Sequence, residues 1–131
     1  MKVLIAEDDF TSRREMNRLL SKYGECDISV DGREAITAFN LALEANDPYD
    51  LVCLDILIPE LDGYQVLRTI RTMEREKKVP EGKQSMVIMT SELSNDKNVM
   101  KASELGCEAY VGKPIDSEKF EKELRKLGLI T

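Results

Sequence analysis

One stretch of the sequence decides the fold: Leu51-Val52-Cys53-Leu54-Asp55-Ile56-Leu57-Ile58-Pro59-Glu60-Leu61-Asp62-Gly63. Its first residues form a short apolar run, typical of a strand buried on both faces of a sheet, and the run ends at the carboxylate of Asp55. A loop containing Pro59 follows, and Asp62-Gly63 then begin a segment with helical periodicity. Asp55 is therefore predicted at the carboxyl end of a strand, the edge of an open α/β sheet where ligands bind.

The same alternation of an apolar run and an amphipathic segment extends through the rest of the chain. We predict strands at residues 2–6, 26–30, 51–55, 85–89 and 107–111, each followed by a helix. Candidate helix caps are capping boxes at residues 12–15 and 31–34 and the single residues Asp62, Ser94 and either Asp116 or Ser117. This alternation indicates one α/β domain, in which a parallel five-stranded sheet lies between two helical layers.

Composition excludes several classes of function. With 131 residues the chain is long enough for one domain with a substantial core. The formal net charge of −6 argues against nucleic acid as a partner; without a signal peptide or a membrane-length apolar run, we expect a cytoplasmic protein with no membrane partner. The three cysteines are far apart and there is no histidine, so we expect core thiols, no zinc site and no Ser-His or Cys-His catalysis. Any chemistry must use carboxylates, hydroxyls and lysine.

Chemically capable side chains follow four of the predicted strands. They are Glu7 and Asp8, then Asp55, then Thr90 and finally Lys113. In a parallel sheet these strand ends share one edge, so three carboxylates would crowd together and favour a hard cation such as Mg²⁺. The Lys113 ammonium and the Thr90 hydroxyl suit anionic oxygens. The set is typical of phosphoryl transfer to a carboxylate, with Asp55 as the attacking group because it stands alone at a central strand.

These motifs resemble the receiver domain of two-component response regulators. In chain order they are Glu7-Asp8, the pattern Leu-Asp-x-x-x-Pro-x-x-Asp-Gly at residues 54–63, Thr90-Ser91 and Lys113-Pro114. The resemblance covers essentially the whole chain. It implies a stand-alone CheY-like receiver over residues 1–131 without an output domain, and a three-layer flavodoxin-like fold with strand order 2-1-3-4-5.

The resemblance also implies a phosphoacceptor site. Asp55 would be phosphorylated by a histidine kinase or a histidine phosphotransfer protein. Asp8 and Asp55 would bind Mg²⁺ (or Mn²⁺) through their carboxylates, Glu7 would contribute through an ordered water, and Leu57 would contribute its backbone carbonyl. The domain would catalyse its own phosphorylation and dephosphorylation at Asp55 without being an enzyme for free substrates.

Further residues would form the switch that the resemblance implies. Thr90 would move its hydroxyl toward the phosphoryl group, and Tyr110 would be the aromatic side chain whose rotamer follows the state of the site. The peptide bond between Lys113 and Pro114 would be cis. Leu57, Glu92 and Pro114 would flank the site, and Leu57 and Glu92 would influence the lifetime of the aspartyl phosphate.

Partner surfaces are less specific in the sequence. Basic residues on the first predicted helix, including Arg14 and Arg18, suggest a docking surface for the phosphodonor protein, although a solvated helix face explains them as well. A downstream target protein is expected but not identified. The protein would be a monomer or a phosphorylation-dependent homodimer.

Three other interpretations stay open at this stage. A phosphohydrolase of the haloacid dehalogenase type also uses a strand-end aspartate, but it needs a second aspartate where this chain has Leu57. A flavodoxin-like cofactor binder needs a phosphate-binding loop where this chain has Glu7-Asp8-Asp9, whose carboxylates would repel a phosphate. An adaptor that works without phosphorylation would be unaffected by the substitution Asp55→Asn.

Overall fold

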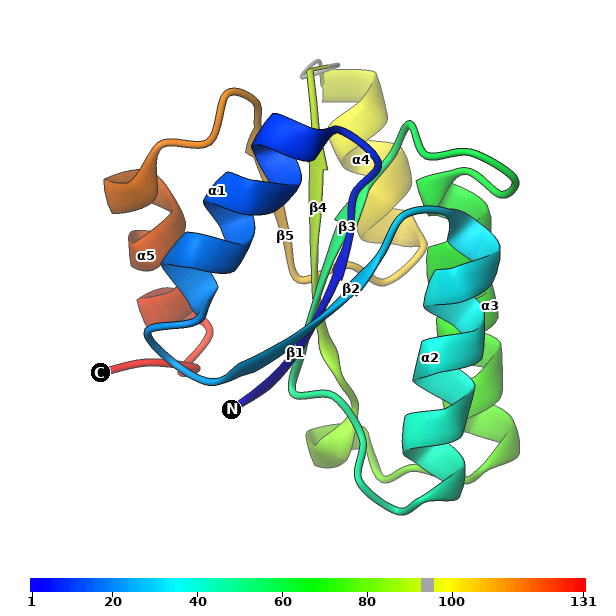
Figure 1. Cartoon of the computed structure of the whole chain (residues 1–131). Helices are drawn as coiled ribbons and strands as arrows, with labels where there is room; N and C mark the ends of the chain where they lie inside the picture. Colours follow the sequence, from blue (N-terminus) through cyan, green and yellow to red (C-terminus); the bar gives the residue numbers. More distant parts are fainter. Residues whose placement is uncertain (93–95) are drawn as a thin grey trace.

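The protein is described here by a computed structural model, which covers residues 1–92 and 96–131 (Figure 1). The strands are β1 (Lys2–Ala6), β2 (Glu25–Ser29), β3 (Leu51–Asp55), β4 (Met86–Ser91) and β5 (Ala109–Gly112). The α-helices are α1 (Phe10–Leu20), α2 (Gly32–Glu44), α3 (Gly63–Glu76), α4 (Asp96–Glu104) and α5 (Ser117–Lys126), and a 3-10 turn, Glu81–Lys83, precedes β4. The predicted cap Ser94 lies outside the described residues.

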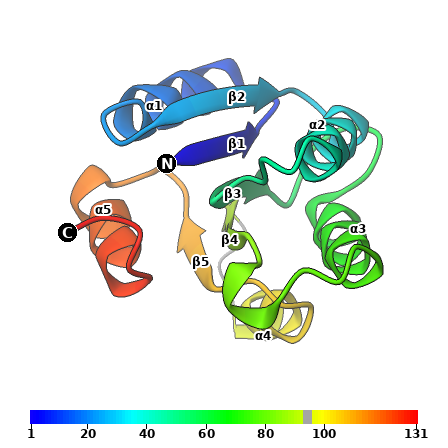
Figure 2. The ribbon, with the colours of Figure 1, turned by 90° about the horizontal axis from the view of Figure 1, so that it is seen from below.

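The five strands form one parallel sheet in the order β2-β1-β3-β4-β5. Helices α1 and α5 cover one face of this sheet, and α2, α3 and α4 cover the other (Figure 2). This arrangement confirms the predicted α/β class, the three layers and the strand order. None of the helices in the described part of the chain has the length and apolar character needed to span a membrane.

Strand β3 is central and is buried along its whole length. Leu51 and Cys53 pack in the cluster beneath α1 and α5, whereas Val52 and Leu54 pack in the cluster beneath α2, α3 and α4. Successive side chains of a strand point to opposite faces, so a strand covered on both sides has no polar position before its end. Cys53 is the core thiol that was predicted.

The prediction of core thiols is confirmed only in part for the other two cysteines, which pack against the core without being fully buried in it. Cys26 and Cys107 are only half-buried, and both are free. Cys26 lies on β2, which pairs with a neighbour on one side only, and Cys107 precedes β5 in a loop. Both positions are at the border of the sheet, where the helical layers cover less of each side chain.

Aspartate side chains begin most of the helices. Asp62 accepts a hydrogen bond from the Gln65 backbone N–H at 3.0 Å, and the Gln65 side chain accepts one from the Asp62 backbone N–H at 3.0 Å, which completes a capping box for α3. Asp31 accepts from the Glu34 backbone N–H at 2.8 Å to begin α2. Asp116, rather than Ser117, caps α5. Each carboxylate satisfies backbone donors that the first helical turn leaves unpaired.

Several predicted boundaries were wrong, and two of them lie beside the strand ends that carry the candidate residues. Helix α1 begins at Phe10 and not after Ser12, because Asp9 accepts the Ser12 backbone N–H at 2.9 Å and is the cap. Strand β4 continues through Thr90 and Ser91, where its pairing with β3 and β5 continues. The Thr90 side chain is therefore held by a strand and not by a loop.

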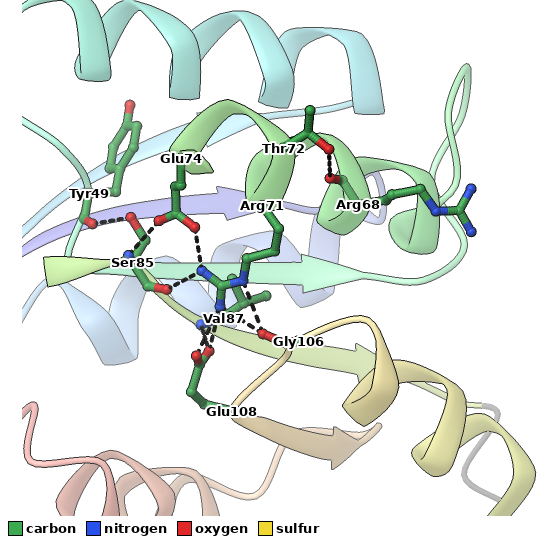
Figure 3. Close-up of polar contacts among 9 residues, drawn as sticks. All are labelled: Tyr49, Arg68, Arg71, Thr72, Glu74, Ser85, Val87, Gly106 and Glu108. Carbon is green, nitrogen blue, oxygen red and sulfur yellow. Dashed lines mark hydrogen bonds and ion pairs between the residues drawn. The ribbon is translucent and has the colours of Figure 1, made fainter. Parts of the chain in front are cut away.

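A buried ionic cluster joins α3 to the amino end of β4 and to the segment after α4 (Figure 3). Arg71 Nη1 donates to the Glu74 carboxylate at 2.7 Å and to the Ser85 carbonyl at 2.8 Å. Nε and Nη2 donate to the Gly106 carbonyl at 3.1 and 2.7 Å, and Nη2 also donates to Glu108 at 2.9 Å. Every guanidinium N–H group has an acceptor, so this cluster fixes α3 against the chain that leaves α4.

Candidate functional site

The carboxyl ends of four strands bring the predicted site residues together. Glu7 and Asp8 directly follow β1, Asp55 is the last residue of β3, and Lys113 directly follows β5. Thr90 is paired in register with Asp55 in the β3–β4 ladder, and the Ile56 backbone N–H donates to the Thr90 carbonyl at 3.0 Å. Parallel pairing thus gathers residues that are far apart in the sequence, as predicted.

Three carboxylates lie at the centre of this edge. Glu7, Asp8 and Asp55 each offer an oxygen atom within 4.8 Å of the others. Glu7 is 3% exposed and Asp55 5%, whereas Asp8 is open to solvent. The backbone N–H of Asp9 donates to Glu7 at 3.2 Å, and that of Leu57 donates to Asp55 at 3.3 Å. These few weak donors leave most of the negative charge to be balanced by something else.

Lys113 provides the balancing charge in this structure. Its ammonium donates to the Glu7 carboxylate at 2.8 Å and to Asp55 Oδ2 at 3.0 Å. Burial lowers the pKa of Lys113, but the hydrogen bonds to Glu7 and Asp55 outweigh burial and the net shift is upward. Lys113 therefore stays charged and holds both carboxylates.

The pKa of Glu7 indicates that Lys113 alone does not balance the negative charge at this edge. Burial is the main cause that raises the pKa of Glu7 to about 7; the bond to Lys113 opposes this rise, and the Asp55 charge adds to it. A carboxylate with such a pKa is partly protonated near neutral pH. An additional cation would be favourable at this position, since it would stabilise the ionised form.

The acidic set fits a hard divalent cation. Mg²⁺ prefers a few carboxylate oxygens supplemented by a backbone carbonyl and water, and it does not need an enclosed protein cage. Glu7, Asp8 and Asp55 supply carboxylates, and the exposure of Asp8 leaves one side open to water. The donor chemistry therefore suits Mg²⁺ or Mn²⁺ and would suit zinc poorly, because zinc sites prefer nitrogen and sulfur.

Tyr110 lies close to this edge on β5. Its ring packs against the core beneath α3 and α4. Burial raises the pKa of its phenol, a hydrogen bond with the Ser91 side chain lowers it, and the Asp55 charge raises it. Thr90, on β4, is 2% exposed. The two predicted switch residues thus lie on adjacent strands beside Asp55.

The residues predicted to flank the site follow the ends of β3, β4 and β5 and are open to solvent. Leu57 is 59% exposed, and Glu92 is also exposed. The Lys113–Pro114 peptide bond is cis, as predicted. The hydrogen bond to Asp55 comes from the Leu57 N–H group; coordination by its carbonyl stays a prediction.

Gly63 has a structural role that we did not predict from the sequence. A Cβ atom at this position would lie 2.5 Å from the Asp55 carbonyl oxygen, and the Gly63 N–H donates to the Ile56 carbonyl at 2.8 Å. Only glycine lets the start of α3 approach the end of β3 this closely. The Asp62-Gly63 pair was the available signal, since a cap followed by glycine can mark a close backbone contact.

Comparison with protein families identifies one clear match. The family model described as "Response regulator receiver domain" matches residues 3–125. A probable transcriptional regulator, ycf27 of Cyanophora paradoxa, is 33% identical over 127 residues, which are 96% of this chain and 47% of the relative. The chain thus spans about half the length of that curated relative.

Solved structures show the same fold. The CheX-CheY-BeF3-Mg complex of Borrelia burgdorferi matches with a TM-score of 0.84 at 23% identity, covering 98% of this chain and 89% of that chain. The receiver domain of Ssk1 of Saccharomyces cerevisiae was solved together with the histidine phosphotransfer protein Ypd1; that structure matches with a TM-score of 0.82 at 21% identity, covering 98% and 88%. At these identities the likeness shows the fold alone.

Proposed function

The chain belongs to the response regulator receiver domain family of two-component systems, and from this premise we propose that Asp55 accepts a phosphoryl group and thereby switches the binding of a partner protein. The family match confirms the resemblance predicted from the motifs. The observation that supports the proposal most is the position of Asp55, 3.0 Å from the Lys113 ammonium and close to the carboxylates of Glu7 and Asp8.

The proposed reaction is a phosphoryl transfer from histidine to aspartate. An oxygen of Asp55 attacks the phosphorus of a phosphohistidine on a histidine kinase or a phosphotransfer protein. The P–N bond breaks, the imidazole nitrogen keeps the electron pair, and an aspartyl phosphate forms. Water later attacks the same phosphorus and releases inorganic phosphate, which restores the carboxylate.

Asp8 and Asp55, with the Leu57 carbonyl, would hold Mg²⁺ or Mn²⁺, and Glu7 would contribute through an ordered water. When bound, this ion supplies positive charge beside the phosphoryl oxygens. Lys113 gives a second positive charge and would turn from the Asp55 carboxylate to a phosphoryl oxygen. The chain's own contribution is therefore to hold the nucleophile still and to stabilise the charge that the transfer moves.

The proposed switch uses Thr90 and Tyr110. The added charge draws the Thr90 hydroxyl toward the phosphoryl group, and the space that Thr90 leaves is filled by the Tyr110 ring. The position of the two residues on adjacent strands supports this coupling. Phosphorylation then shifts a population between two packings of the region around α4 and β5.

The phosphodonor protein is proposed to dock on α1. Phe10, at the start of α1, is 63% exposed, and the Arg13 guanidinium lies 5.5 Å from the centre of its ring. Arg14 and Arg18 are exposed one helical turn apart. The complex between the Ssk1 receiver and Ypd1 is a precedent in that protein for a receiver bound to a phosphotransfer protein.

Charge reversal tests the docking surface. Replacing Arg14 and Arg18 by Glu should slow transfer from the phosphodonor protein by at least about tenfold, because steering between charged surfaces acts mainly on association rate. Labelling by acetyl phosphate should stay unchanged. Equal slowing of both reactions would contradict docking on α1.

The phosphoacceptor chemistry is tested by intact-protein mass after incubation with acetyl phosphate, with and without Mg²⁺. The wild-type protein should gain one alkali-labile phosphoryl group only with Mg²⁺, and Asp55→Asn should gain none. Beryllofluoride, which mimics the phosphoryl group, should stabilise the wild type with Mg²⁺ but not Asp55→Asn. Absence of both responses would overturn the proposal in favour of a phosphorylation-independent adaptor.

The family assignment disfavours the hydrolase and cofactor-binding interpretations that the sequence had left open. We propose that residues 1–131 form a single receiver domain. A cytoplasmic location, the identity of the target and a phosphorylation-dependent homodimer stay predictions.

A further inference from the structure

Tyr64 has a buried hydroxyl that finds no hydrogen-bond partner in the described part of the chain. It is the second residue of α3, and its oxygen is closed to water and has no partner among the described residues. A buried hydroxyl that lacks a hydrogen bond destabilises the arrangement that contains it. Such a group in a native structure needs an explanation, and a bridging water cannot supply one where the oxygen is closed to water.

The surroundings of Tyr64 connect it to the phosphoacceptor edge. Tyr64 directly follows Gly63, whose backbone packs against the Asp55 carbonyl. Its ring packs in the same cluster as Tyr110 on β5. The Lys101 ammonium of α4 lies 4.3 Å from the centre of the Tyr64 ring. Tyr64 thus contacts α4 directly and packs against the same cluster as Tyr110 of β5, so it lies beside both of the elements that the proposed switch moves.

The charges of the two phenols also influence one another. Burial is the main cause that raises the pKa of Tyr64, and the neighbouring Tyr110 is the next cause. The arrangement is that of the unmodified protein, because Lys113 is paired with Glu7 and Asp55. A displacement of Tyr110 or of α4 would therefore change the surroundings of the Tyr64 hydroxyl.

We propose that Tyr64 is a positioning residue of the switch, whose hydroxyl is unpaired in the unmodified packing and gains a hydrogen bond, from or to Tyr110, in the phosphorylated packing. The proposal rests on the phosphoacceptor function of Asp55. The hydroxyl destabilises one packing and stabilises the other, so both effects favour the phosphorylated packing. Tyr64 acts through Tyr110 and does not touch the phosphoryl group.

Three tyrosine-to-phenylalanine variants test the proposal. Without ligand, Tyr64→Phe should raise the melting temperature by about 3 °C, because it removes an unpaired buried hydroxyl. Tyr49→Phe is the matched control, since its hydroxyl donates to Asp27 at 2.6 Å, and it should lower the melting temperature by a similar amount. Tyr110→Phe removes the proposed partner of Tyr64.

The affinity for beryllofluoride in saturating Mg²⁺ is the second measurement, because it would not change if Tyr64 had a purely structural role. Tyr64→Phe should raise the apparent dissociation constant for beryllofluoride about fivefold, whereas Tyr49→Phe should leave it unchanged. In the Tyr110→Phe background, adding Tyr64→Phe should change beryllofluoride affinity less than Tyr64→Phe does in the wild type.

The outcomes separate this proposal from the function it rests on. A fall in melting temperature for Tyr64→Phe equal to that of Tyr49→Phe would show that the hydroxyl is already paired, and unchanged beryllofluoride affinity would show that it does not sense the switch; either result overturns the role of Tyr64. A wild-type protein that does not respond to beryllofluoride, or an Asp55→Asn variant that responds equally, would instead overturn the phosphoacceptor function.

Discussion

Two buried ionic clusters lie at opposite ends of the same sheet, and they differ in how their charges are satisfied. At the amino end of β4, Arg71 donates to acceptors with all of its N–H groups, and its partner Glu74 also accepts the Ser85 backbone N–H at 2.8 Å. At the carboxyl ends, Lys113 holds Glu7 and Asp55 by single contacts.

The chemistry of the two cations explains the difference. A guanidinium is planar and presents donors in fixed directions, whereas an ammonium is a point charge on a flexible stem. Backbone donors also satisfy the carboxylates around Arg71, as in the 2.6 Å bond from the Val87 N–H to Glu108. One cluster has a single favourable arrangement and serves as an anchor. The other has surplus negative charge and can rearrange when a cation or phosphoryl group arrives.

The largest expected effect is the loss of the anchor. Arg71→Met should lower the free energy of unfolding by about 3–5 kcal/mol, because it leaves buried Glu74 and the carbonyls of Ser85 and Gly106 without their donor. Urea unfolding measures this change. Arg68→Met, an exposed position on the same helix that points away from the cluster, is the control and should stay within about 0.5 kcal/mol of wild type (Figure 3). Similar losses for both variants would assign the effect to helix α3 itself.

A second prediction concerns pH and the surplus charge at Glu7. Its pKa is raised from 4.5 to about 7, so the folded protein keeps a proton that the unfolded chain has already lost between these values. Stability from this group therefore falls as pH rises through that window, and it is level above it. Glu7→Gln has no carboxyl group at this position and does not lose this stability. Without Mg²⁺, the unfolding free energy of Glu7→Gln minus that of the wild type should therefore increase by about 2 kcal/mol from pH 4.5 to 7.5.

Unfolding curves of the two proteins at several pH values provide the measurement. Added Mg²⁺ should stabilise the wild type more at pH 7.5 than at pH 5.5, because the ion favours the ionised carboxylate. A difference between Glu7→Gln and wild type that does not change with pH would contradict the raised pKa.

A third, smaller effect is expected for a hydrogen bond that lies next to the Arg71 cluster. Ser85→Ala removes the bond from the Ser85 hydroxyl to the Tyr49 carbonyl, 2.5 Å long, while the backbone contacts of Ser85 with Arg71 and Glu74 persist. We expect a loss of about 1 kcal/mol in urea unfolding, typical of one hydrogen bond. A loss comparable to that of Arg71→Met would show that the cluster depends on this side chain.

The smallest effect on stability, with a large effect on function, is expected for Lys113→Arg. The guanidinium keeps the charge that Glu7 and Asp55 require, so the free energy of unfolding should change by less than about 1 kcal/mol. It is bulkier and fixed in direction, so acetyl phosphate labelling of Asp55 should fall sharply. Normal labelling would show that the site needs only positive charge and not the mobility of lysine.

Much of the fold could be predicted from the sequence because its signals are local. The run ending at Asp55 and the cap at Asp62 mark a strand end and a helix start within a few residues. The errors were local as well. Ser12 matched a capping pattern, but Asp9, about one turn earlier, is an equally good capping residue. The spacing of residues in the sequence does not show which of two candidate caps begins the helix.

The sequence by itself determined the alternation of strands and helices and the residues at the strand ends, because hydrophobic period and capping depend on neighbours along the chain. Only the tertiary structure decided what those residues contact. Lys113 reaches Glu7 across 106 positions of sequence, Arg71 contacts Glu108 beyond the next helix, and the Tyr64 hydroxyl has no partner among the residues that the structure describes. Such contacts depend on which strands become neighbours and on how helices pack over them, and no local pattern contains that information.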